Sequence, residues 1–223
     1  MNKILNKIVW LIIPVPVIYL SLIWSNIPET IPLHFDLKGN ADRFGNKKEL
    51  IVPVIILTVI SLFIYYLFKN IYRIDPKKYA AENKGRLQRI GFAVAVFMTA
   101  INCLIIYGGA NRSSRFDISL VLGGVGLLFA IIGNYMPNMK PNYFAGFRLP
   151  WTLENPDNWK KTHALAARLW FAGGLLLAVF CLLAPAIIAL IIFFTVTLVM
   201  IIIPVVFSYR LYKKTKMQDN INS

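Results

Sequence analysis

Acidic residues and cysteines are scarce in this chain of 223 residues. The sequence has 10 Asp and Glu against 24 Lys and Arg, which leaves a formal net charge of +14, and it has two cysteines. Both of them, Cys103 and Cys181, fall in long apolar runs, where cysteine behaves as a small buried apolar residue. They therefore tell us nothing about the redox compartment in which the protein resides.

Long apolar runs dominate the sequence, since 57% of its residues are hydrophobic. A helix that crosses a bilayer needs about 20 mostly apolar residues. We therefore predict an all-α polytopic membrane protein with six transmembrane helices. Their approximate ranges are Ile8–Ser25, Ile51–Phe68, Ile90–Tyr107, Ile118–Met136, Leu165–Leu183 and Ala186–Phe207.

Apart from Arg168 in the first turn of the fifth range, none of these six helix cores contains Asp, Glu, Lys, Arg or His. Ion pathways and proton relays in membranes depend on such ionisable groups. Their absence argues against a proton-coupled transporter, and against an intramembrane protease, which needs a buried nucleophile, carboxylates or metal ligands. The milder polar groups, among them Ser61, Thr99 and Asn102, are predicted to form hydrogen bonds between helices.

The distribution of Lys and Arg predicts the orientation of the chain. If the N-terminus lies inside, 18 of the 24 fall in inner segments and six in outer loops. This bias places both termini in the cytoplasm. A basic charge can also indicate nucleic-acid binding, but here it is spread over several short loops, so we predict no direct nucleic-acid partner. The six outer residues are Lys38, Arg43, Lys47, Lys48, Arg112 and Arg115.

We divide the chain into three regions. Residues 1–68 form an N-terminal membrane hairpin with an outer loop, residues 69–136 form helices three and four with a basic inner loop, and residues 137–223 form a C-terminal region. Glycine-rich faces on helices four and five predict that these two helices pack closely. Pro14 and Pro16 are predicted to bend helix one.

The outer loop, residues 26–50, has the pattern of a small β-hairpin. Apolar residues alternate along 31–35, which is typical of a strand. The turn that follows contains Gly39, which can adopt a positive φ. Gly45 and Asn46 indicate a second turn. The loop is therefore predicted to form an extracellular lid over the outer end of the helices.

Three side chains of this loop, His34, Asp36 and Asp42, belong to residue types that bind metals. One histidine and two carboxylates in a loop form a weak pattern, so we predict no metal and no cofactor. The two carboxylates are expected to cap turns or to pair with Lys38 or Arg43.

Residues 142–168, NYFAGFRLPWTLENPDNWKKTHALAAR, form a polar and aromatic island between two apolar runs. Asn155 is a favourable N-cap and Pro156 suits the first position of a helix. A helix is therefore predicted to begin near Pro156 and to continue into span five, with residues 150–152 before it. Its residues Trp159 and His163 fall on one face by their spacing of four.

The aromatic and charged residues of the island also have simpler interpretations. Tryptophans near membrane ends are commonly interfacial anchors, and we interpret Trp151, Trp159 and Trp170 in this way. Arg148 is expected to pair with Glu154 or with a phospholipid phosphate.

An enzymatic role for His163 with Glu154 or Asp157 lacks the nucleophile or metal set that catalysis would need. We therefore predict that the protein is not an enzyme. A small peptide transporter or exporter remains an alternative, although the chain lacks a nucleotide-binding loop and intramembrane carboxylates.

The run NYFAGFRLPWTL at 142–153, followed by Trp159 and His163, resembles the SdpI family of immunity proteins against the sporulation-delaying peptide toxin. The segment IPLHFDLKGNADRFGNK at 31–47 resembles a small domain of unknown function that often precedes it. This resemblance implies a bacterial cell-membrane protein that protects the cell from a peptide toxin. It also implies signalling, in which the toxin-occupied protein holds a cytoplasmic transcriptional autorepressor at the membrane.

Two candidate sites follow from the resemblance and the predicted orientation. The predicted toxin site on the extracellular loop comprises His34, Phe35, Asp36, Gly39, Asp42 and Lys47. The predicted cytoplasmic docking motif comprises Asn142, Tyr143, Gly146, Arg148, Pro150, Trp151, Thr152, Trp159 and His163.

Overall fold

The computed structural model describes residues 3–77, 79–111 and 117–222. Arg112 and Arg115, two of the predicted outer cations, lie outside the described residues. Six of the described helical segments are long and apolar enough to cross a membrane, which confirms the predicted number. The elements are α1 (Lys3–Ile12), α2 (Val15–Ile23), β1 (Thr30–Phe35), β2 (Ala41–Asn46), α3 (Ile51–Asn70), α4 (Ala80–Ala110), α5 (Ile118–Tyr135), α6 (Pro150–Glu154), α7 (Pro156–Leu183) and α8 (Ala186–Asn222), with short 3-10 helices η1 (Trp24–Asn26), η2 (Lys47–Leu50), η3 (Ile71–Arg73) and η4 (Met136–Asn138).

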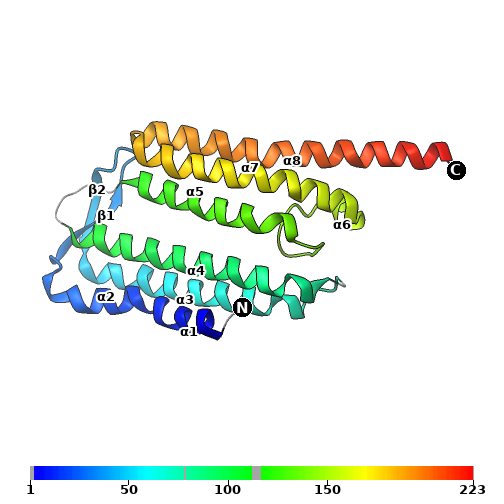
Figure 1. Cartoon of the computed structure of the whole chain (residues 1–223). Helices are drawn as coiled ribbons and strands as arrows, with labels where there is room; N and C mark the ends of the chain where they lie inside the picture. The colour runs from blue at the N-terminus through cyan, green and yellow to red at the C-terminus, as the bar shows by residue number, and fades with distance from the viewer. Residues whose placement is uncertain (1–2, 78, 112–116, 223) are drawn as a thin grey trace.

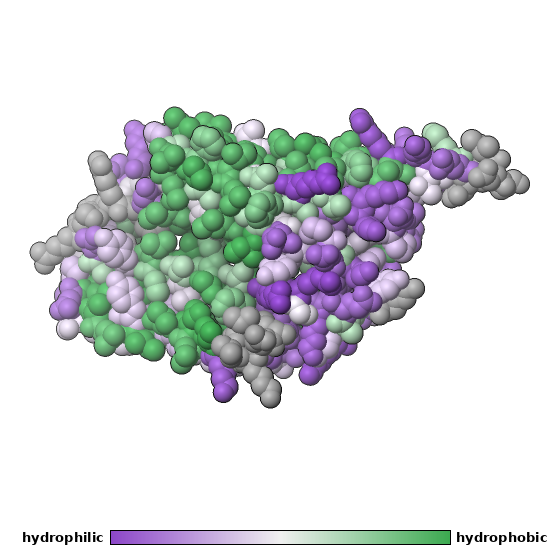
Figure 2. Space-filling model, viewed as in Figure 1, coloured by the Kyte–Doolittle hydropathy of each residue, from purple (hydrophilic) through white to green (hydrophobic). Residues whose placement is uncertain are grey.

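The long helices run side by side as one bundle (Figure 1). Helices α1 to α4 lie together, and α5, α7 and α8 lie together next to them. The β1–β2 hairpin covers one end of the bundle, whereas α6 and the loop before it lie at the opposite end. Hydrophobic residues cover the middle of the visible surface, and hydrophilic residues gather at the end that carries α6 (Figure 2). This pattern suits a bundle whose middle is surrounded by lipid.

The first span is broken at its prolines, as predicted. Helix α1 ends at Ile12 and α2 begins at Val15. Ile13 and Pro14 lie between them, and Pro14 is the N-cap residue of α2. Proline has no N–H to donate and its ring displaces the preceding turn. The break therefore follows directly from the local sequence.

Helices α5 and α7 pack closely through glycine, which confirms the predicted pairing. A Cβ atom added at Gly126 would lie 2.6 Å from the backbone nitrogen of Ala178. One added at Gly174 would lie 2.4 Å from the backbone nitrogen of Ala130. No side chain fits at either position, so the two backbones are in direct contact. In lipid such close packing drives helix association, because burial of apolar surface from water contributes little there.

Helices α3 and α4 are joined by hydrogen bonds inside the bundle. The Asn102 side-chain amide donates to the Val54 carbonyl at 3.0 Å and to the Thr58 hydroxyl at 3.1 Å. The Ser61 hydroxyl donates to the Ala95 carbonyl at 3.5 Å. The prediction that the mild polar residues link helices is confirmed for Asn102 and Ser61.

The predicted outer hairpin is present. Strands β1 and β2 pair antiparallel, with a register irregularity around His34. The turn between them contains Gly39 at a φ of 81°. This is the left-handed region that glycine enters without a steric penalty.

The second predicted turn, at Gly45 and Asn46, is wrong. Both residues belong to β2. A Cβ at Gly45 would lie 2.2 Å from Leu33 Cδ1 and 2.5 Å from Glu49 Oε1, so any larger residue would have to displace these two side chains. Asn46 instead caps η2, since its side chain accepts the Lys48 amide while the Glu49 carboxylate accepts the Asn46 amide.

Substitution of Gly126 tests the α5–α7 contact. We expect Gly126→Ala to lower the free energy of unfolding by about 1–3 kcal/mol, the usual cost of forcing atoms into a packed interface. The measurement is thermal unfolding of the purified protein in detergent. Gly85→Ala in α4 is the matched control, because a Cβ there has no atom within 4 Å. Equal stability of the Gly126→Ala variant and the wild type would show that the interface is loosely packed.

Candidate functional site

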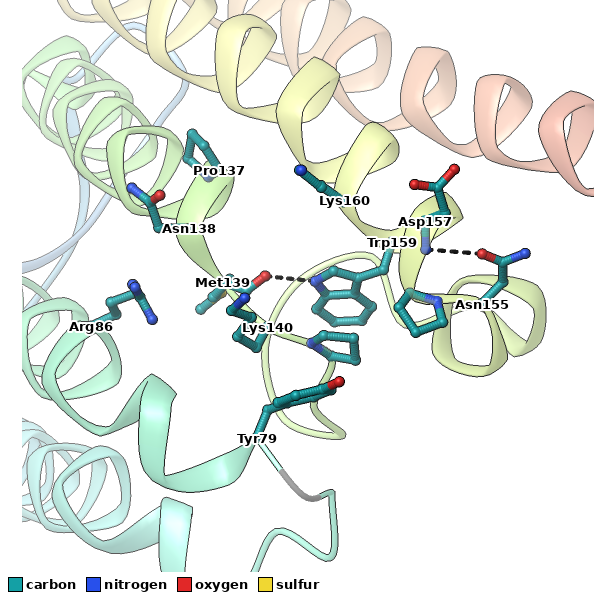
Figure 3. A pocket seen from close by; sticks show the side chains of 12 residues that line it. Tyr79, Arg86, Pro137, Asn138, Met139, Lys140, Asn155, Asp157, Trp159 and Lys160 are labelled. Atoms are coloured by element: carbon teal, nitrogen blue, oxygen red, sulfur yellow. Dashed lines mark hydrogen bonds between the residues drawn. The ribbon is translucent and has the colours of Figure 1, made fainter.

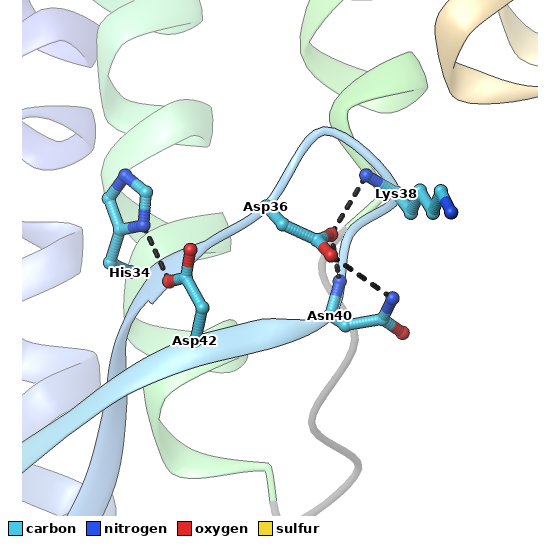
Figure 4. Close-up of polar contacts among 5 residues, drawn as sticks. All are labelled: His34, Asp36, Lys38, Asn40 and Asp42. Carbon is cyan, nitrogen blue, oxygen red and sulfur yellow. Dashed lines mark hydrogen bonds and ion pairs between the residues drawn. The ribbon is translucent and has the colours of Figure 1, made fainter.

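The outer hairpin presents a hydrogen-bonded pair of side chains, one from each strand. His34 Nδ1 lies 2.6 Å from Asp42 Oδ1, and both side chains are largely exposed (Figure 4). The prediction that Asp42 caps a turn or pairs with Arg43 is therefore wrong, since Arg43 faces Glu49 at 3.5 Å. The bulge between the strands brings His34 and Asp42 to the same side of the hairpin.

Asp36 caps the hairpin turn, as predicted. Its carboxylate accepts the backbone amides of Asn40 and Lys38, both at 2.8 Å (Figure 4). These hydrogen bonds, that from the Asn40 amide first, hold the pKa of Asp36 below its ordinary value. The stabilisation is therefore present at neutral pH and is lost only as the pH falls through the lowered pKa. No group of three His, Cys, Asp or Glu able to hold a metal occurs among the described residues.

Lys47 secures the base of the hairpin. Its ammonium group lies 2.9 Å from the Glu29 carboxylate, donates to the Ile27 carbonyl at 3.4 Å, and sits 5.2 Å from the Trp24 ring centroid. The side chain of Lys47 is only 12% exposed. Of the six residues in the predicted toxin site, Lys47 therefore supports the loop, whereas His34 and Asp42 present exposed polar groups.

An apolar cavity of about 290 Å³ lies beneath the hairpin. Phe35, which also belongs to the predicted toxin site, is part of the cavity wall. The cavity can accept an apolar side chain, because Glu49 is the only charged residue among those that line it. The lining residues are Pro32, Leu33, Phe35, Glu49, Leu50, Pro53, Ile105 and Gly109.

The inner loop, which we define as residues 139–149, is anchored to α7 by His163. The His163 ring is buried and stacks on the Trp159 indole with a centroid separation of 3.9 Å. Its Nε2 atom accepts the Phe147 amide at 3.1 Å, so Nδ1 carries the proton and donates to the Trp159 carbonyl at 2.9 Å. The imidazole is therefore neutral, and both of its nitrogens are engaged in holding the backbone.

Gly146 permits this approach of the loop to α7. Its φ is +102°, and a Cβ at this position would lie 2.2 Å from His163 Nε2. Any other residue would both strain the backbone and displace the ring. Gly146 and His163, separated by 17 positions in the sequence, therefore form one structural unit.

Two asparagines satisfy the backbone of the inner loop. The buried Asn142 carboxamide accepts the amides of Phe144 and Ala145 at 2.9 and 2.8 Å and donates to the Lys140 carbonyl. Asn83 in α4 makes a reciprocal pair of 3.0 Å hydrogen bonds with the backbone of Lys140. Sequence reasoning missed Asn83, because it lies 57 residues before its partner and no local pattern marks it.

Ser208 in α8 was also missed. Its hydroxyl accepts the Trp151 indole N–H at 3.0 Å, and its carbonyl accepts the Asn158 side-chain amide at 2.9 Å. These bonds attach α6 and the start of α7 to the last helix. Its place in the sequence, directly after the predicted span Ala186–Phe207, gives no sign of this role.

The interpretation of Trp159 as an interfacial anchor is wrong. Its side chain is 1% exposed and its indole donates to the Met139 carbonyl at 2.7 Å. Trp170 is half-buried and donates to the Met200 carbonyl in α8 at 3.1 Å. The predicted helix start is confirmed, since Asn155 caps α7 and Pro156 is its first residue. However, residues 150–152 form part of the separate helix α6.

The inner motif therefore has a buried and an exposed part. Asn142, Thr152, Trp159 and His163 are buried and shape the loop. Tyr143, Gly146, Arg148 and Pro150 are exposed, and Trp151 is half-buried. The Arg148 guanidinium donates to the Tyr143 carbonyl at 2.6 Å. Of its two predicted partners, Glu154 is therefore wrong, and a phospholipid phosphate stays a prediction.

Comparison with known proteins relates this geometry to a family. Residues 138–208, which contain the inner loop and its anchors, match the family model of the SdpI/YfhL protein family. The predicted resemblance to the SdpI family is confirmed over this region. Residues 11–59, which contain the hairpin, match a Domain of unknown function (DUF1648).

Individual relatives agree with this assignment. The chain is 28% identical to the Immunity protein SdpI of Bacillus subtilis (strain 168), over 86% of this chain and 88% of that protein. An uncharacterized protein of Archaeoglobus fulgidus is 36% identical over 28% of this chain and 34% of its own length. No solved structure gives a significant match. With its six apolar helices, the protein is a multi-pass bacterial membrane protein related to an immunity family rather than to an enzyme family.

Replacement of His163 tests the anchoring of the inner loop. We expect His163→Phe to keep an aromatic ring against Trp159 but to leave the Phe147 amide without its acceptor. A buried donor without a partner costs about 1–3 kcal/mol, so thermal unfolding in detergent should occur at a lower temperature. His34→Phe on the exposed hairpin is the control and should change stability by less than about 1 kcal/mol. Equal effects of the two substitutions would contradict the anchoring role.

Proposed function

We propose that this protein is a membrane immunity protein whose hairpin end faces outward and binds a secreted peptide toxin. The observation that carries the proposal is the structured hairpin above an apolar cavity, in a chain that is similar along most of its length to an immunity protein. The family resemblance makes the sporulation-delaying peptide the first toxin to test. The second candidate site, the inner motif, lies at the other end of the bundle (Figure 1).

The geometry of the hairpin suggests how such a toxin binds. An apolar side chain of the peptide enters the cavity beside Phe35, while polar groups of its backbone meet the exposed His34–Asp42 pair. Peptides that contact a membrane are rich in apolar side chains. Retention of the peptide on the hairpin would keep it from inserting into the bilayer, which is sufficient for protection without transport.

The inner motif is the proposed docking surface for a cytoplasmic transcriptional repressor. Tyr143, Arg148 and Pro150 are exposed on the rigid inner loop, and Trp151 is half-buried beside them. Tyrosine, tryptophan and arginine are the residues that most often carry the binding energy of protein interfaces. The buried residues of the motif hold these groups in position, so their substitution would act on docking indirectly.

The proposal requires the hairpin to lie outside the cell and α8 to end inside. We expect Lys38→Cys in the hairpin turn to react with a membrane-impermeant maleimide on intact cells. Lys214→Cys near the end of α8 should react only after the membrane is permeabilised. Both substitutions are made in a background in which Cys103 and Cys181 are replaced by serine and alanine, respectively. The opposite labelling pattern would reverse the assignment of the two ends.

A killing assay tests immunity directly. The protein is produced in a bacterium sensitive to the sporulation-delaying peptide, and survival is measured against graded toxin. We expect the wild-type protein to raise the lethal dose, and Phe35→Ala, which opens the cavity wall, to lower it again by about tenfold, the effect of losing roughly 1.4 kcal/mol of binding. His34→Ala and Asp42→Ala should weaken protection in the same direction.

Phe44→Ala is the matched control for this assay, since Phe44 is 54% exposed on the neighbouring strand and does not line the cavity. Each variant is first shown to reach the membrane in wild-type amounts. If the wild-type protein fails to protect at any dose, the resemblance does not extend to this toxin. If Phe35→Ala and Phe44→Ala protect equally, the cavity is not the toxin site.

A further inference from the structure

A cavity of about 640 Å³ lies at the inner end of the bundle. It lies between the start of α4, residues 137–141 and the first turn of α7 (Figure 3). Three cationic residues from these three segments line it, namely Arg86, Lys140 and Lys160. Segments that are far apart in the sequence thus bring three positive charges around one hollow, which we call the basic cavity.

The negative charges nearby leave this cavity with a positive balance. Asp157 also lines it, but its carboxylate lies 2.8 Å from the Lys161 ammonium. The Arg86 guanidinium donates to the Glu82 backbone carbonyl at 2.8 Å. This acceptor is uncharged, so the hydrogen bond does not neutralise the positive charge of Arg86. The Glu82 carboxylate is 4.0 Å from Lys140. The cavity therefore offers its excess positive charge to an anion.

The depth of the cations fits the headgroup layer of a membrane. The predicted span of α4 begins at Ile90, four residues after Arg86, and that of α7, which has Arg168 in its first turn, begins at Leu165, five residues after Lys160. At about 1.5 Å per residue, the two cations lie about 6–8 Å beyond the apolar layer. The polar headgroup region of each leaflet is about 5–8 Å thick. Both side chains therefore lie where lipid phosphates are found.

A second, apolar cavity of about 310 Å³ adjoins the basic cavity, and Met139 lines both. Its other walls come from α3, α4, α5, the inner loop, α7 and α8, and none of the residues that line it is charged. A ligand with an anionic head and an apolar chain would match the two cavities in turn. This arrangement favours a phospholipid over a free phosphate ion.

We propose that the basic cavity binds a phosphate group, and that this group is presented by the headgroup of an anionic phospholipid from the surrounding leaflet. Arg86, Lys140 and Lys160 contact the phosphate, and Trp159 forms part of the adjoining wall. The bound lipid joins α4 to α7, which belong to the two neighbouring groups of helices in the bundle. This function is separate from the proposed immunity, because it needs no toxin.

Lipid retention by the purified full-length protein tests the proposal. Delipidated protein in detergent is titrated with phosphatidylglycerol or with phosphatidylcholine of the same acyl chains, and bound lipid is counted by native mass spectrometry. We expect phosphatidylglycerol to bind more tightly. Arg86→Gln and Lys160→Gln should each weaken its binding about fivefold, since one basic residue near an anionic membrane surface contributes about 1 kcal/mol.

Arg89→Gln is the matched control, because Arg89 lies one turn further along α4, faces the Tyr135 ring at 6.0 Å and does not line the cavity. Equal weakening by Arg86→Gln and Arg89→Gln would overturn the proposal in favour of general surface charge. An equal affinity for the two lipids, with no effect of inorganic phosphate, would overturn it as well.

Competition with inorganic phosphate shows whether the bound phosphate group belongs to a lipid headgroup or to a free ion. Displacement of bound phosphatidylglycerol by millimolar phosphate supports recognition of the phosphate group on the lipid. Phosphate binding that depends on Arg86 and Lys160, without retention of phosphatidylglycerol, would keep the phosphate site and assign it to the free ion. Wild-type lipid retention by the Lys160→Gln variant, combined with loss of repressor recruitment in cells, would overturn the proposal and make this surface a protein interface.

Discussion

The hydrogen bond from the Phe147 amide to the His163 ring is the contact on which the inner end of the structure depends. Backbone polar groups that are shielded from water need protein partners. The neutral imidazole supplies an acceptor for the loop and a donor for its own helix. Gly146 is the residue that allows the two segments to come so close. The exposed face of the loop is held in shape by this buried contact.

The two ends of the bundle are stabilised by different kinds of interaction. The outer hairpin is held by exposed ion pairs and turn caps above an apolar cavity, and such surface pairs each contribute little stability. The inner loop is held by hydrogen bonds to α4 and α7, whose loss leaves unsatisfied groups. A hairpin of this kind can adjust to a ligand, whereas the inner loop is a preformed surface. This contrast is compatible with the proposed binding of a toxin at one end and the proposed docking of a repressor at the other.

Local sequence rules predicted much of this fold. Apolar runs of sufficient length give six spans, prolines break the first of them, and Asn155 with Pro156 starts α7. The hairpin follows from alternating residues around a glycine turn. The second turn at Gly45 was predicted wrongly, because glycine serves equally in a turn or beneath a packed neighbouring side chain, and only the position of Leu33 distinguishes the two.

The sequence by itself determined the membrane class, the number of spans, the family resemblance and the residues of both motifs, because these depend on local composition and spacing. Only the tertiary structure decided what each motif residue does. Trp159 is a buried hydrogen-bond donor rather than a lipid anchor, His163 holds the inner loop, and Arg86, Lys140 and Lys160 surround one cavity. The physical reason is that these roles come from contacts between segments far apart in the chain, and a pattern along one segment carries no information about its distant partner.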